Sequence, residues 1–141
     1  MNTISNRKST LDKDFFNNLT IMYVEDEKNI RDKLVLILET LFKNTIICTN
    51  GKEGYEAFKA SKENGENIDI VVSDINMDEM NGMDMLKLIR QIDDKVPFIF
   101  TTAYSDSEYI NEAKKYGVSY YVIKPIDVKE ILIYIKEIFD K

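Results

Sequence analysis

The sequence predicts an α/β fold in which one parallel five-stranded sheet carries helices on both faces. Short apolar runs alternate five times with longer segments of helical period, which is the pattern of repeated βα units. The runs are apolar at nearly every position, as expected for strands that helices cover on both sides. A chain of 141 residues, 44% of them apolar, is long enough for one domain with its own core.

The expected elements follow one another without long gaps. Strands are expected at the apolar runs formed by residues 19–24, 45–48, 68–73, 97–101 and 119–123. Helices are expected at residues 27–42, 50–65, 82–92, 105–117 and 127–141. The second helix ends at an Asn-Gly pair and the fourth at Gly117, where a left-handed backbone is favoured. Asp127 is a suitable N-cap for the last helix.

Composition excludes several classes of protein. The 25 acidic and 19 basic residues give a net charge of −6, which disfavours direct binding to nucleic acid or to an anionic membrane. No apolar run is long enough to cross a bilayer. A single cysteine, Cys48, excludes an internal disulfide framework and a zinc site with several thiolates, which favours a cytoplasmic location. We expect residues 1–18 to form a flexible or partly helical extension and residues 19–141 to form the folded domain.

Polar side chains follow the expected strands at one end. Glu25 and Asp26 come after the first strand, Asp74 after the third, Thr102 after the fourth and Lys124 after the fifth. In open sheets of this type ligands bind beyond the carboxyl ends of the strands, where the strand order reverses. If the first and third strands are neighbours, as in the flavodoxin-like order 2-1-3-4-5, three carboxylates converge on one pocket.

These residue types match the needs of phosphoryl transfer. Three crowded carboxylates repel one another, and Mg²⁺, with Mn²⁺ as a substitute, takes such oxygen ligands and often pairs with phosphate. The backbone carbonyl of Asn76 is a candidate for a further oxygen ligand. Asp74 is the expected nucleophile because it lies centrally, while Lys124 and the Thr102 hydroxyl are placed to contact the phosphoryl oxygens.

Four motifs occur in order at the strand ends: YVEDE from Tyr23, SDINMDEMNG from Ser73, TTA from Thr101 and YYVIKP from Tyr120. Asp26 is followed by Asp74, Thr102 and Lys124 at separations of 48, 28 and 22 residues. With these motifs the chain resembles the receiver domains of bacterial two-component response regulators, which have the chemotaxis-type receiver fold. The resemblance covers about residues 19–139.

The resemblance implies a role for each matching residue. The roles are metal binding for Glu25, Asp26 and Asp74, phosphorylation for Asp74, a switch hydroxyl for Thr102, phosphoryl contact for Lys124, and an aromatic rotamer switch for Tyr121. It also implies a cis peptide bond between Lys124 and Pro125. Tyr121 is equally well interpreted as a packing aromatic. Asp78 stands where the family usually has proline, and we expect it to loosen the loop and to tune metal affinity or phosphoryl lifetime.

Partners are also implied. The chain has no histidine, so a phosphohistidine donor has to be another molecule, a sensor histidine kinase or a histidine phosphotransfer protein. Phosphorylation is expected to change the face built by the fourth helix, fifth strand and last helix, which would contact an effector or output domain. Ile133 and Tyr134 give the last helix more apolar surface than one buried face needs, which suggests a homodimer.

Two rival hypotheses remain. The chain ends directly after the last helix, so it is also interpreted as a receiver fragment of a larger signalling enzyme or transcription factor. Haloacid dehalogenase-type phosphatases also combine a strand-end aspartate with Mg²⁺, but their DxDxT pattern is replaced here by DINMD. We therefore expect no catalytic activity other than self-phosphorylation and dephosphorylation.

Overall fold

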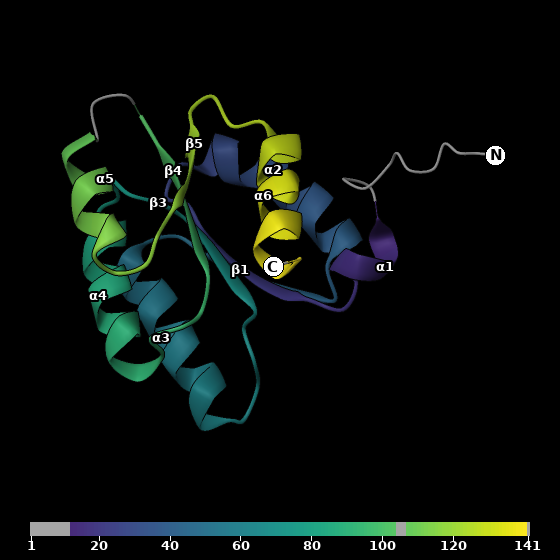
Figure 1. Ribbon diagram of the computed structural model, residues 1–141, viewed down its shortest axis with the longest axis horizontal. Coiled ribbons are helices and arrows are strands. Elements are labelled where there is room, and N and C mark those ends of the chain that lie inside the picture. The colour runs from purple at the N-terminus through teal and green to yellow at the C-terminus, as the bar shows by residue number, and fades with distance from the viewer. Residues whose placement is uncertain (1–11, 104–106, 141) are drawn as a thin grey trace.

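The sheet has five parallel strands in the order β2-β1-β3-β4-β5, which confirms the predicted fold (Figure 1). The computed structural model describes residues 12–103 and 107–140. Its strands are β1 Thr20–Val24, β2 Asn44–Cys48, β3 Ile70–Asp74, β4 Phe98–Thr102 and β5 Tyr120–Ile123. Its helices are α1 Lys13–Phe16, α2 Lys28–Leu41, α3 Gly51–Glu63, α4 Gly82–Ile92, α5 Ser107–Lys114 and α6 Val128–Phe139.

Two of the predicted strands end one residue too early. The third and fourth strands were expected to end at residues 73 and 101, but β3 includes Asp74 and β4 includes Thr102. Ladder bonds are made by the backbone, so a polar side chain at the strand end does not stop the pairing. Asp74 is paired with Thr101 in the register of β3 and β4. The expected start of the fourth helix at residue 105 lies outside the described residues.

Helices cover the sheet on both faces and create two separate cores. One core is packed by α3, α4 and α5, and the other by α1, α2 and α6 (Figure 1). Side chains alternate between these cores along each strand, as the pleat requires. In β1, Met22 and Val24 join the first core, while Ile21 and Tyr23 join the second. The strands are apolar in nearly every position because both of their faces are buried.

The residues just before the sheet are part of the packed structure. In α1, the Phe16 side chain is completely buried and belongs to the second core. The Phe15 ring contacts Phe16 and lies 6.3 Å from the Phe139 ring of α6, centroid to centroid. Residues 1–11 of the expected extension lie outside the described residues. We propose that the folded domain begins near Asp12 rather than at residue 19, which limited proteolysis would test by the position of the first protected residue.

Local signals set the helix ends near the site. Asn50 and Asn81 cap α3 and α4 by accepting hydrogen bonds from the backbone N–H groups of Glu53 and Asp84. Gly117 ends the turn after α5 with φ of 85°, as its predicted left-handed position requires. No helix among the described residues is long and apolar enough to span a membrane.

The loop after β3 is held tightly against the strand that carries Asp74. The N–H of Gly82 donates to the Ile75 carbonyl at 2.7 Å, which folds residues 75–82 back on the end of the strand. A Cβ atom on Gly82 would overlap the backbone carbonyl oxygen of Asp74. Glycine at this position therefore allows α4 to start directly beside the acidic end of the sheet.

Candidate functional site

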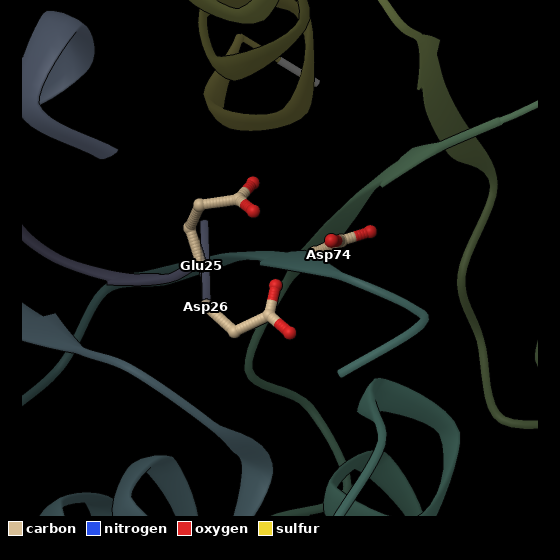
Figure 2. Close-up of side chains that lie close together, drawn as sticks. All are labelled: Glu25, Asp26 and Asp74. Atoms are coloured by element: carbon tan, nitrogen blue, oxygen red, sulfur yellow. The ribbon is translucent and has the colours of Figure 1, made fainter. Parts of the chain in front are cut away.

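Three carboxylates meet at the carboxyl end of the sheet, as expected when the first and third strands are neighbours. Glu25 and Asp26 directly follow β1, and Asp74 ends the neighbouring strand β3. One carboxylate oxygen from each residue lies within 4.8 Å of the others. Figure 2 shows the Glu25 and Asp26 side chains leaving the strand on opposite sides and both reaching toward Asp74.

The acid pair is fixed mainly through backbone contacts. Glu25 is fully buried, and its Oε2 accepts a hydrogen bond from the Glu27 N–H at 3.1 Å. Asp26 is more exposed. Arg31 of α2 reaches back over the start of its helix and donates from Nη1 to the carbonyl oxygens of Glu25 at 2.9 Å and Asp26 at 3.3 Å. The only sequence signal for this role is a basic residue one turn into the helix that follows the acid pair.

Lys124 supplies the positive charge of the pocket. It follows β5, and its side chain is 23% exposed. Its Nζ donates to Asp74 Oδ2 at 2.9 Å and lies 3.8 Å from Glu25 Oε1. The bond from Lys124 to Pro125 is cis, as the family resemblance implied. The structure therefore brings together four predicted residues, the three acids and the lysine.

Burial and mutual repulsion shift the protonation of the acids. Burial and then the charge of Asp74 raise the pKa of Glu25 to about 7. Burial also raises the pKa of Asp74, although the hydrogen bond from Lys124 opposes this change. For Lys124, burial lowers the pKa, but the hydrogen bond and charge of Asp74 outweigh it and the pKa lies above its usual value. One lysine only partly neutralises three acids.

The donor set fits a hard divalent cation. The three ligand atoms of this cluster are carboxylate oxygens, which Mg²⁺ prefers, and Lys124 is hydrogen-bonded to Asp74 alone among the three acids. Glu25 Oε1 is buried and has no hydrogen-bond partner in the described part of the chain. A buried carboxylate oxygen without a donor is costly, and a cation in the pocket would relieve that cost.

The predicted switch residues bond to backbone groups beside the acid cluster. Thr102 is fully buried, and its hydroxyl donates to the Ala103 carbonyl at 3.0 Å. The Tyr121 hydroxyl lies 2.8 Å from the Val118 carbonyl oxygen and 3.2 Å from that of Ile110, so its ring is held against α5.

Asp78 contacts the pocket in a way that sequence reasoning missed. Its backbone N–H points to Asp26 Oδ2 at an N–O distance of 3.4 Å. Proline has no N–H, so the residue usually found at this position in the family cannot make this contact. Asp78 therefore places a backbone donor near Asp26 in addition to bringing a carboxylate into this loop. The Asn76 residue is exposed in the same loop, and its carbonyl stays a predicted ligand.

Residues 21–136 match the family described as the response regulator receiver domain. The chain belongs to this family. Sporulation initiation phosphotransferase F of Bacillus subtilis (strain 168) is 32% identical over 123 residues, which cover 81% of this chain and 88% of that protein. This receiver domain is thus the phosphoacceptor module of a two-component system, and it is a signalling domain rather than a conventional enzyme.

Other relatives agree with the fold and differ in length. The uncharacterized transcriptional regulatory protein YesN of Bacillus subtilis (strain 168) is 30% identical over 118 residues, which cover 84% of this receiver domain and 32% of that protein. A crystal structure of the CheX-CheY-BeF3-Mg+2 complex from Borrelia burgdorferi is similar in fold, with a TM-score of 0.79 and 23% sequence identity. The match covers 94% of this receiver domain and 97% of that chain. The receiver domain spans 13% to 32% of four curated relatives.

Proposed function

We propose that Asp74 is the residue that accepts the phosphoryl group, beside Mg²⁺ bound by Glu25, Asp26, Asp74 and the backbone carbonyl of Asn76. The observation that carries this proposal is the meeting of three carboxylates within 4.8 Å beside a lysine ammonium. Asp74 is the nucleophile because Lys124 contacts its carboxylate at 2.9 Å and is placed to contact a phosphoryl oxygen there. Mn²⁺ is expected to substitute for Mg²⁺.

The chemistry is transfer of one phosphoryl group to a carboxylate. A carboxylate oxygen of Asp74 attacks phosphorus, an acyl phosphate bond forms, and the bond from phosphorus to the donor nitrogen breaks. The leaving imidazole belongs to a histidine kinase or histidine phosphotransfer protein, because this chain contains no histidine. Lys124 neutralises charge on the transferred oxygens, and the divalent cation supplies further neutralisation when bound.

The output is a change in charge that reaches a partner surface. Phosphorylation adds about −1.5 to −2 charges at Asp74. We expect the Thr102 hydroxyl to turn toward the new oxygens and the Tyr121 ring to follow, which would break its bonds to the Val118 and Ile110 carbonyls. This would change the α5-β5-α6 face, where an effector or output domain binds. NMR tests this step: the Tyr121 hydroxyl proton should exchange with solvent faster after phosphorylation.

The metal requirement is tested with a small phosphoryl donor. The protein is incubated with acetyl phosphate and Mg²⁺, Mn²⁺ or a chelator, and intact mass is measured over time. We expect the mass of one phosphoryl group to be added with either cation and almost none with the chelator, because the lysine alone leaves the acids under-neutralised. Equal phosphoryl uptake in the chelator would contradict the proposed metal site.

A second copy of the chain is the partner we propose for the α5-β5-α6 face. Ile123 and Ile133 are 43% and 42% exposed there. The Tyr134 ring contributes less than expected, because it packs on Tyr120 with centroids 5.0 Å apart. Ile133→Ser is expected to lower the dimer fraction formed with beryllofluoride in sedimentation, whereas Leu36→Ser on α2, 72% exposed, is not. A monomer with and without beryllofluoride would rule out the dimer.

A further inference from the structure

Three buried polar atoms lack hydrogen-bond partners, and they lie on one face of the sheet. Among the residues that the structure describes, the side-chain atoms concerned are Tyr23 Oη, Glu25 Oε1 and Thr101 Oγ1. Tyr23 lies in β1 and Glu25 directly follows it, where the Glu25 N–H still donates to the Cys48 carbonyl, so alternation points both side chains to the side of α2 and α6. Thr101 is the register partner of Asp74 and shares that face. All three side chains therefore lie on the side of the sheet that α2 and α6 cover.

The Tyr23 hydroxyl has few ways to find a partner. Tyr23 is completely buried in the second core, so packing restricts its ring. An unpaired buried hydroxyl costs free energy, and most such groups in folded proteins have a partner. A phenol hydroxyl is a hydrogen-bond donor, so an acceptor on the same face of the sheet would relieve this cost.

Glu25 needs a donor of this kind. Its Oε2 is bonded to the Glu27 N–H, whereas Oε1 has only the distant ammonium of Lys124, 3.8 Å away. Lys124 is already bonded to Asp74 at 2.9 Å. A second donor on the α2 and α6 side of the sheet would hold the Glu25 carboxylate in place without drawing the lysine away from Asp74.

We propose that Tyr23 is a positioning residue whose hydroxyl donates to the Glu25 carboxylate through one buried water and thereby orients it toward Mg²⁺. This inference rests on the proposed metal site. It assigns to Tyr23 a role in metal affinity while Lys124 remains available to the phosphoryl group. The alternative is that the hydroxyl is only an unpaired group tolerated by the core.

The two alternatives predict opposite results for Tyr23→Phe, which removes only the hydroxyl. Mg²⁺ affinity is measured by calorimetry, and thermal unfolding is measured on the metal-free protein. We expect the dissociation constant for Mg²⁺ to rise about three- to tenfold, the effect of losing one hydrogen bond of ordinary strength. The melting temperature of the metal-free variant should stay the same or rise. Tyr120→Phe makes the same chemical change at the opposite end of the sheet and should leave Mg²⁺ affinity unchanged.

A second background shows whether Tyr23 acts through Glu25. In Glu25→Met, which keeps the length of the side chain but removes its oxygens, adding Tyr23→Phe should weaken Mg²⁺ binding no further. Equal Mg²⁺ affinity of the wild type and Tyr23→Phe overturns the positioning role and leaves the proposed function intact. The same loss of affinity in the Glu25→Met background also overturns it. If the wild type binds no Mg²⁺, the proposed metal site itself is wrong.

Discussion

Asp74→Asn is expected to reduce phosphoryl uptake from acetyl phosphate to the background level. Asparagine keeps the size of the side chain and its place at the end of β3, but its amide oxygen is a poor nucleophile and cannot form a stable acyl phosphate. The substitution also removes one of three crowded negative charges. Repulsion among the acids therefore falls, and it should not destabilise the folded variant. The measurement is intact mass after incubation with Mg²⁺ and acetyl phosphate.

A matched control separates the loss of the nucleophile from the loss of one carboxylate elsewhere in the protein. Asp84 is an exposed residue of α4, and Asp84→Asn makes the same chemical change outside the pocket. This control should be phosphorylated at the wild-type rate. If Asp74→Asn gains the phosphoryl mass as fast as the control, another side chain accepts the group and the assignment of Asp74 is wrong.

The topology and the meeting of the acids were predictable because they depend on patterns that a sequence carries directly. Strands buried on both faces read as continuous apolar runs, and polar residues directly after them have to gather at one edge of a parallel sheet. Glu25, Asp26, Asp74 and Lys124 were placed in this way, and the structure brings them together. Strand ends were less predictable, because backbone pairing continues through polar residues.

Contacts that depend on the backbone were not predictable from the sequence. The N–H of Asp78 lies near Asp26 only because Gly82 allows the loop to fold back on β3. The unpaired state of the Tyr23 hydroxyl depends on how the second core packs around it. A tyrosine inside an apolar strand is interpreted as a core residue. The alternation of the strand does not show which groups its hydroxyl oxygen contacts. The packing of Phe16 likewise depends on where the chain enters the domain.

Lys124→Met is expected to slow phosphorylation by about 10²-fold, the usual cost of removing one charged group that stabilises a transition state. Methionine keeps most of the aliphatic volume of the side chain and removes the ammonium that lies 2.9 Å from Asp74. The rate is measured by intact mass with acetyl phosphate and saturating Mg²⁺. Lys129→Met, at an exposed position of α6, makes the same change away from the pocket and should phosphorylate at the wild-type rate.

The same substitution should make stability depend on pH in a particular direction. The pKa values of Glu25 and Asp74 are already raised in the folded state, and loss of the lysine raises them further. A raised carboxyl pKa contributes stability at low pH, and this contribution is lost as the pH rises through the folded-state value. Without cation, Lys124→Met should therefore be less stable than the wild type by about 1–3 kcal/mol at neutral pH, the cost of an uncompensated buried group. The difference should disappear below about pH 3, where both acids are protonated in the folded and in the unfolded state. A deficit of the same size at both pH values would mean that Lys124 stabilises the fold through packing rather than through its charge.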